Sequence, residues 1–403
     1  MRTPHVETGR SHIFAKLLKT GCVFICLACF FTPLSTSLLG LFSGLAVLMW
    51  LLSGNFLKLP HMLISYPSAA IALILFVLMC LALIYTPVEP LEALDTLKKY
   101  RELLLLPVML SLLTGLTKYQ KIAENSFVAG CIILMLLSYG MFFEFIPEQR
   151  YGHSLVFHIT HSFFMAVLSF WALHRAVSTQ RLRYFWLIIY LATVVNIFYI
   201  APGRTGMFVF VFLMVLFLIQ RFTLIQCIFG LLVFCSALTL FYITSDNFSG
   251  RIHEVVKEIK TYEQDKSITS IGQRFDWWVT SFELIKKKPV LGYGTGSFSR
   301  IYEQTTKTTR VKSMDNPHNE YIFITFQVGV IGLFLFLMIF LLQFLASRSL
   351  PTQKGMLLQG VLVAMLSGSL MNSLLFDSQQ GHFYLLMSAT LMTMTLPKFG
   401  DSN

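Results

Sequence analysis

The sequence predicts an all-α polytopic membrane protein with about twelve membrane-crossing helices and one large outer loop. Composition is the first indication: of 403 residues, 55% are hydrophobic and 13% charged, and the mean hydropathy is +0.68. Soluble domains carry about 25% charged residues, so a soluble globular fold is excluded. Intrinsic disorder, a disulfide scaffold and a coiled coil require fewer apolar residues or another periodicity, and they are excluded as well.

Twelve apolar segments approach the roughly 20 residues that a helix needs to cross a bilayer. They are residues 20–34, 36–54, 67–86, 100–116, 123–143, 154–173, 184–201, 206–220, 222–244, 320–345, 356–376 and 383–397. We therefore expect nine transmembrane helices in residues 1–244, a loop domain containing helices at 245–319, and three further helices with a short tail in residues 320–403. The apolar segment after Lys19 continues without a cleavage site, so no cleavable signal peptide is expected.

Positive residues in the short loops predict the orientation, because loops rich in Lys and Arg stay on the cytoplasmic side. With the N-terminus inside, the cytoplasmic segments hold fourteen such residues and the short outer loops five. Both termini are therefore expected in the cytoplasm, and the loop at 245–319 is expected on the outer face. The net charge of +11 largely expresses this bias, so we expect membrane lipids and no nucleic acid as partners.

The large loop predicts two amphipathic helices. The first carries apolar residues at helical spacing, namely Ile252, Val255, Val256 and Ile259. The second, expected from about 271 to 288, carries Phe275, Trp278, Phe282 and Ile285 on one face. Its adjacent residues Trp277 and Trp278 could lie at the membrane interface or pack onto the bundle. The segment Gly292–Gly296 follows a helix rather than a strand, so we interpret it as a turn covering the site and not as a nucleotide-binding loop.

Two arginines are candidates for holding an anionic substrate. Arg204 lies in a short turn on the outer side, where positive charge is disfavoured; it could contact lipid headgroups, or hold a phosphate through its rigid donor fork. Arg274 lies in the first turn of the second loop helix, where the backbone N–H groups also favour an anion. The alternative for Arg274 is a surface ion pair with Asp276 or Glu283.

His318 is the candidate base, because it lies at the entrance to a membrane span and an imidazole titrates near neutrality. The alternative is a structural histidine that caps the following helix. Arg101, in a short outer loop, and Asp377 and His382, at the turn between the last two spans, are further candidates for lining the pocket. Solvation of helix ends is the alternative for Asp377 and His382.

No metal or other cofactor is expected. The outer loops contain no Asp-x-Asp pair for Mg²⁺ or Mn²⁺, and His158 and His161 lack a third ligand. The seven cysteines all fall in apolar spans and are interpreted as packing residues. Sequence signatures of kinases, lipases and zinc proteases are also missing.

Three motifs together resemble those of the bacterial O-antigen ligases, within the wider O-antigen polymerase and ligase superfamily. The first is the turn that contains Arg204. The second runs from Arg274-Phe-Asp-Trp-Trp through Ser281-Phe-Glu-Leu-Ile285 to Pro289-Val-Leu-Gly-Tyr-Gly294, and the third is Pro317-His-Asn-Glu-Tyr321. The first half of the chain contributes only its hydropathy to this resemblance.

The resemblance implies a metal-independent inverting glycosyltransferase of GT-C-like architecture at the periplasmic face of the bacterial inner membrane. Its donor would be O-antigen on undecaprenyl diphosphate, and its acceptor a sugar hydroxyl of the lipid A-core oligosaccharide. By the same resemblance, Arg204 and Arg274 would bind the diphosphate and His318 would be the catalytic base. An O-antigen polymerase of the same superfamily remains the alternative, and a secondary transporter is disfavoured because the charges lie at span ends.

Overall fold

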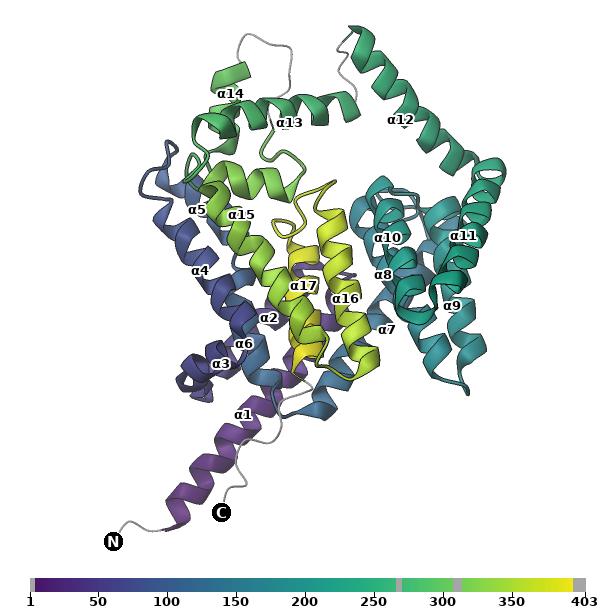
Figure 1. The fold of residues 1–403 in the computed structure, drawn as a ribbon. Coiled ribbons are helices and arrows are strands. Elements are labelled where there is room, and N and C mark those ends of the chain that lie inside the picture. The colour runs from purple at the N-terminus through teal and green to yellow at the C-terminus, as the bar shows by residue number, and fades with distance from the viewer. Residues whose placement is uncertain (1–3, 266–269, 307–313, 394–403) are drawn as a thin grey trace.

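The protein is all-α, as the sequence predicts. A computed structural model describes residues 4–265, 270–306 and 314–393. Within these ranges no β-strand forms, and one isolated bridge joins Gln149 to Gly152. The long apolar helices make the chain a polytopic membrane protein (Figure 1).

The helices follow one another with short connections. Before the large loop they are α1 (Pro4–Phe31), α2 (Thr36–Leu52), the 3₁₀ turn η1 (Asn55–Lys58), α3 (Leu59–Ser65), α4 (Pro67–Leu81), α5 (Pro90–Lys98), α6 (Glu102–Leu113), α7 (Thr117–Phe142), α8 (His158–Ser178), α9 (Arg183–Val195), the π-helical turn η2 (Asn196–Ile200), α10 (Arg204–Arg221) and α11 (Leu224–Thr244). The loop region contains α12 (Asp246–Asp265), α13 (Ser270–Lys287) and α14 (Phe298–Thr306), and the chain continues with α15 (Glu320–Ser347), α16 (Thr352–Gly368) and α17 (Ser378–Met392). The two helices expected in the loop are confirmed as α12 and α13.

The expected count of twelve membrane-crossing helices is not confirmed. Six helices in the described ranges are long and apolar enough to cross a membrane, or seven if the pair on either side of an 82° bend after α2 forms one span. A helix lies at each of the other expected segments, but α4, α6, α16 and α17 have 15, 12, 17 and 15 residues. The last of them begins at Ser378 and not at residue 383.

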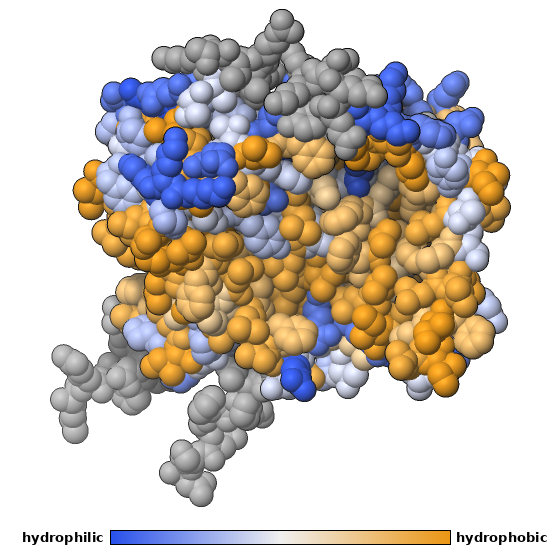
Figure 2. Space-filling view, turned by 45° about the horizontal axis from the view of Figure 1, so that its top comes forward, coloured by the Kyte–Doolittle hydropathy of each residue, from blue (hydrophilic) through white to orange (hydrophobic). Residues whose placement is uncertain are grey.

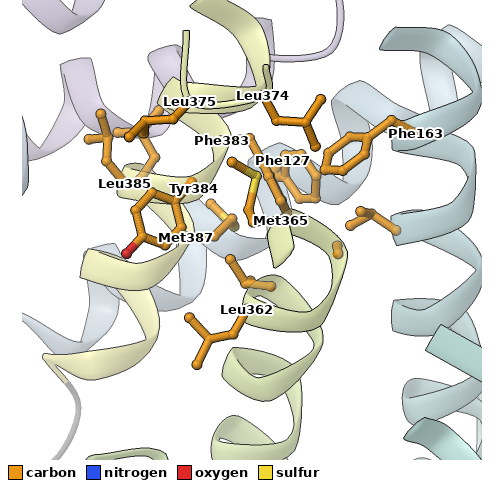
Figure 3. Packing of buried hydrophobic residues seen from close by; sticks show 14 of the residues in the cluster. Phe127, Phe163, Leu362, Met365, Leu374, Leu375, Phe383, Tyr384, Leu385 and Met387 are labelled. Carbon is orange, nitrogen blue, oxygen red and sulfur yellow. The ribbon is translucent and has the colours of Figure 1, made fainter. Parts of the chain in front are cut away.

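Helices in the interior of the bundle escape the usual length and hydropathy rule because protein, and not lipid, surrounds them. Nearly every residue of α17 and most of α8 are buried. The Phe383 ring of α17 lies 5.1 Å from that of Phe127 on α7 and 5.6 Å from that of Phe163 on α8, measured between centroids (Figure 3). A methyl group at Gly360 of α16 would overlap the Phe170 ring, so glycine permits this close approach. The C-terminal helices therefore form the centre of the bundle.

The polar end of the molecule is built by the loop region. Helix α13 lies across the end of the bundle above α15, α16 and α17, while α1 begins at the opposite end (Figure 1). A broad hydrophobic band covers the flank below the hydrophilic residues of this polar end (Figure 2). Helix α11 has no buried residue, which suits a helix facing lipid.

The glycine-rich turn after α13, interpreted from the sequence as a turn covering the site, packs against α15. The backbone N–H groups of Tyr293 and Gly294 donate to the carbonyls of Phe326 and Gln327, both at 2.9 Å, and the Gly296 N–H donates to Gln327 Oε1 at 2.9 Å. The turn thus packs against the kink of α15, where Gly329 has a φ of 67°. Since these N–H groups are already used, the turn fastens α13 to α15.

Candidate functional site

Arg204 is the first residue of α10, and glycines on either side of it set its position. Gly203 and Gly206 lie against Ser162 of α8, where a methyl group at either position would overlap the Ser162 side chain. The start of α10 therefore sits directly on α8. The π-helical turn η2 precedes this segment, and such turns are frequent at functional sites.

Two carboxylates of α12 hold the Arg204 side chain. Arg204 Nη2 donates to Glu254 Oε2 at 2.9 Å and to Glu258 Oε1 at 3.2 Å. Glu254 also accepts from Arg251 at 3.0 Å. Hydrogen bonds from Arg204 and then Arg251 lower the pKa of the Glu254 carboxyl. Arg204 is therefore engaged with protein carboxylates rather than simply extended towards lipid.

Arg274, in the first turns of α13, lines the same space as Arg204. Burial lowers the pKa of its guanidinium, the charge of Arg204 lowers that pKa further, and Glu258 opposes both effects. Arginine nevertheless remains charged in proteins. The alternative surface pair is not seen: Glu283 binds Lys286 at 2.9 Å, and no ion pair of Arg274 is found in the described ranges.

Two adjoining pockets share these arginines. The polar one, of about 410 Å³, is lined by His158, Ile159, Pro202, Arg204, Thr205, Arg251, Glu254, Glu258 and Arg274. The apolar one, of about 370 Å³, is lined by Arg204, Thr205, Phe208, Val255, Ile259, Arg274, Phe275, Trp278 and Met371. A cationic pocket that continues into an apolar one suits a ligand with an anionic group next to a hydrocarbon chain.

His318 lies in the loop before α15, and the tryptophans of α13 hold that loop. The Trp278 Nε1 donates to the Pro317 carbonyl at 2.9 Å, and the ring centroid of Trp277 lies 5.4 Å from that of His318. Of the two alternatives for these tryptophans, packing onto the bundle is therefore the observed one. His318 has a φ of 51°, and its N–H donates to Asn316 Oδ1 at 2.9 Å. A non-glycine residue in this left-handed region costs about 1–3 kcal/mol, and such strain is concentrated at functional sites.

The imidazole of His318 is partly buried, and it has a hydrogen-bond partner from the turn between α16 and α17. Its Nδ1 lies 2.7 Å from Asn372 Oδ1. Burial lowers the pKa of His318 from 6.5, the charge of Arg274 lowers it further, and the Asn372 hydrogen bond acts in the opposite direction. Burial therefore favours the neutral ring, which is the form that a base needs. The helix-capping role considered for His318 belongs instead to Asn319, whose side chain accepts from the Ile322 N–H.

The three further candidates occupy different places. Asp377 lies beside the His318 partner, since its Oδ2 accepts from Asn372 Nδ2 at 3.0 Å. His382 is fully buried within α17, with its Nδ1 3.1 Å from Glu102 Oε1. Arg101 is exposed, donates to the Lys98 carbonyl at 3.0 Å and lines neither pocket of the arginines.

Sequence reasoning missed the carboxylates and the amide that contact these residues. Glu254 and Glu258 were part of an expected amphipathic helix, but nothing in the sequence pairs them with an arginine about fifty residues away. Asn372 lies in a stretch without any motif. The sequence pattern provides no signal for it, because its role depends on two turns that meet only in the folded bundle.

The fold and the site define a multi-helix membrane protein with a cationic pocket at its polar end. Residues 189–337 match the family model described as O-Antigen ligase, and this range includes Arg204, Arg274 and His318. These residues are therefore similar to an O-antigen ligase domain, which is consistent with a member of the O-antigen ligase and polymerase superfamily. Such a domain implies glycosyl transfer in O-antigen processing, with polysaccharide or lipid-linked substrates. A search of curated proteins finds no match to the chain.

Proposed function

We propose that the protein is an O-antigen ligase of the bacterial inner membrane. It transfers O-antigen polysaccharide from undecaprenyl diphosphate to a sugar hydroxyl of the lipid A-core oligosaccharide. The reaction takes place at the periplasmic face, at the end of the bundle where α13 lies (Figure 1). The observation that carries the proposal is the pair of arginines, distant in the chain, that line one polar pocket within the O-antigen ligase domain.

The proposed chemistry is a single displacement. The acceptor hydroxyl oxygen forms a bond to the anomeric carbon, the bond from that carbon to the diphosphate oxygen breaks, and the hydroxyl proton passes to His318. Arg204 and Arg274 stabilise the negative charge that grows on the leaving diphosphate. Because one base acts and no protein nucleophile takes part, the anomeric configuration inverts. This assignment requires no metal ion, since the guanidinium groups carry the positive charge.

The neighbouring apolar pocket supports the same substrate class. Phe208, Phe275 and Trp278 line it next to the two guanidinium groups. A hydrocarbon chain attached to a diphosphate could therefore lie against these side chains while the phosphates face the arginines. Holding both lipid substrates at one membrane surface also contributes to the rate, because the encounter becomes effectively intramolecular.

The deciding experiment is transfer in vitro by purified protein. A lipid-linked glycan is supplied with either rough lipopolysaccharide or a second lipid-linked glycan as acceptor, and the products are separated by gel. Glycan attached to the lipid A-core supports the ligase, whereas glycan extended on the lipid carrier identifies a polymerase instead. No product with either acceptor would overturn glycan transfer.

Variants test the assigned residues in the same assay. Arg274→Ala and His318→Ala are expected to abolish attachment while the protein remains in the membrane. Arg150→Ala is the matched control, because Arg150 is an exposed arginine of an expected outer loop and stacks over the Tyr151 ring. A normal lipopolysaccharide ladder from either site variant would reject the role assigned to that residue.

A further inference from the structure

The His318 ring stands at one end of a chain of hydrogen bonds. Its Nδ1 lies 2.7 Å from Asn372 Oδ1, and Asn372 Nδ2 donates to Asp377 Oδ2 at 3.0 Å. An ionised carboxylate can only accept hydrogen bonds, so the amide N–H of Asn372 must face Asp377 and its oxygen must face His318. That oxygen can only accept as well. The proton of the neutral imidazole therefore lies on Nδ1, and the lone pair lies on Nε2.

We propose that Asn372 and Asp377 are positioning residues of the glycosyl-transfer site, which select the Nδ1–H tautomer of His318 and direct Nε2 towards the acceptor hydroxyl. The inference rests on the proposed function, in which His318 takes the acceptor proton. Because the Asp377 carboxylate only accepts hydrogen bonds, Asn372 turns its N–H towards Asp377 and its oxygen towards the His318 ring.

The side chain of Asp377 has no competing local role. Asp377 precedes α17, where an aspartate commonly caps the helix, yet its side chain makes no capping hydrogen bond. The carboxylate binds Asn372 instead. Solvation of a helix end, the alternative considered from the sequence, therefore does not account for its orientation.

The turn that carries Asn372 is itself held rigidly. The Leu375 and Phe376 N–H groups donate to Glu320 Oε2 at 2.9 and 3.2 Å, and the Glu320 N–H donates to the Ser369 carbonyl at 3.0 Å. Tyr100 donates to the other Glu320 oxygen at 2.9 Å. A buried carboxylate with three donors thus clamps the turn onto the start of α15, so Asn372 stays within reach of His318.

The ring is confined on its other sides too. The Trp277 ring of α13 lies 5.4 Å from it between centroids, tilted by 37°. Asn316 Oδ1 accepts both the backbone N–H of His318 at 2.9 Å and the Ser373 hydroxyl at 3.3 Å. A base whose direction is set by packing and by a hydrogen bond loses little entropy when substrate binds. The local geometry therefore supports a positioned base.

The neighbouring charges determine the pH range in which the hydrogen bonds from His318 through Asn372 to Asp377 have one fixed direction. Burial raises the pKa of Asp377 to about 6, and Lys99 opposes this rise. Arg274 is the cation that faces His318 from α13, while Glu320 is the other acid near Asp377. Above about pH 6 the Asp377 carboxylate is ionised and can only accept hydrogen bonds. The donor-to-acceptor direction of the hydrogen bonds is then fixed.

The first test reads the tautomer directly and does not depend on activity. Solid-state NMR on ¹⁵N-histidine-labelled protein at pH 7.5, with His318→Gln used for assignment, is expected to show a protonated Nδ1 and an unprotonated Nε2. Asn372→Leu is expected to produce a mixture of both tautomers. A protonated Nε2 in the unaltered protein would overturn the inference, even if glycan transfer were demonstrated.

The second test exchanges the side chains of Asn372 and Asp377. In Asp377→Asn, either end of the new amide can face Asn372, so the direction of the hydrogen bonds is no longer fixed. The kcat is therefore expected to fall about tenfold, while the KM of the lipid-linked donor stays within about twofold. In Asn372→Asp combined with Asp377→Asn, the new carboxylate at 372 accepts from both neighbours. The polarity is then restored, and kcat should recover most of the loss.

The pH profile of the exchanged variant provides a further readout. A carboxylate directly against the imidazole raises the pKa of His318, so the acidic limb of kcat should move to higher pH than in the unaltered protein. A role in packing alone predicts neither the recovery nor this shift. Equal kcat values for Asp377→Asn and the double variant would therefore contradict the proposal.

A matched control distinguishes the effect of losing any buried amide from the effect of losing the Asn372 amide. Asn55 is 5% exposed and Asn372 is 7% exposed. Asn55 donates to the carbonyl and hydroxyl of Ser111 at 3.1 and 2.8 Å, far from the site. Asn55→Leu is expected to keep kcat unchanged, whereas Asn372→Leu lowers it about 100-fold. If the unaltered protein transfers no glycan at all, the proposed function fails while the NMR result still decides the tautomer.

Discussion

Before a donor binds, Glu254 and Glu258 form ion pairs with the guanidinium group of Arg204. In the proposed mechanism, the same guanidinium group binds the diphosphate of the donor. Arg204 lies 2.9 Å from Glu254 and 3.2 Å from Glu258, and the three side chains are 27%, 51% and 17% exposed. The diphosphate must therefore compete with carboxylates of α12. Removing one carboxylate should strengthen donor binding, and Glu258→Gln is the most informative change because Glu258 also faces Arg274.

The size of the effect follows from the exposure of the ion pair. Partly exposed pairs contribute about 0.2–1 kcal/mol. The upper end of that range corresponds to roughly fivefold in an equilibrium constant. Glu258→Gln is thus expected to lower the donor KM by up to about fivefold with little change in kcat. Glu254→Gln should have a smaller effect, since Glu254 is half exposed.

The assay measures initial rates of transfer against the concentration of lipid-linked donor in detergent. Glu283→Gln is the charge-matched control, because Glu283 lies on α13 and pairs with the exposed Lys286. A raised KM or a strongly reduced kcat in Glu258→Gln would refute the competition and would place the carboxylate among the groups that help transfer. Higher salt should reduce the difference between Glu258→Gln and the unaltered protein.

Three further outcomes are expected. Gly206→Ala should lower the midpoint of thermal unfolding, since overpacking against Ser162 costs about 1–3 kcal/mol, whereas a methyl group at Gly44 meets no neighbour and Gly44→Ala should leave the midpoint nearly unchanged. The rate of transfer should fall on acidification, because protonation removes the neutral form of His318 that acts as the base. Since burial lowers the pKa of His318, the acidic limb of the pH–rate profile should lie below pH 6.5, and an acidic limb above that value would contradict the burial of the ring. A chelator should leave the purified enzyme active, and a complete loss that Mg²⁺ reverses would contradict the metal-free assignment.

The helices were predictable from the sequence because apolar segments are local features. The predicted helix from about 271 to 288 is observed as α13 (Ser270–Lys287). The number of membrane-crossing helices was not predictable in the same way. Hydropathy measures the preference of a segment for an apolar environment, and it does not separate a helix facing lipid, such as α11, from one surrounded by protein, such as α17.

The candidate site was predictable in its residue types and only partly in its geometry. Arg204, Arg274 and His318 stand out because each has an unusual position relative to a span or a helix start. The structure places both arginines at one pocket and His318 within electrostatic reach of Arg274. Arg101, selected from its outer loop alone, lies away from that pocket, because proximity along a membrane face does not ensure proximity in space.

By itself, the sequence determined that this protein is a helical membrane protein, and it singled out the arginines and the histidine through their chemistry. Only the tertiary structure decided that Glu254 and Glu258 engage Arg204, that Asn372 engages His318 and that Asp377 engages Asn372. The physical reason is that hydropathy and helix periodicity act over a few turns. A hydrogen bond between residues fifty or more positions apart depends on how whole helices pack, and no local pattern encodes that packing.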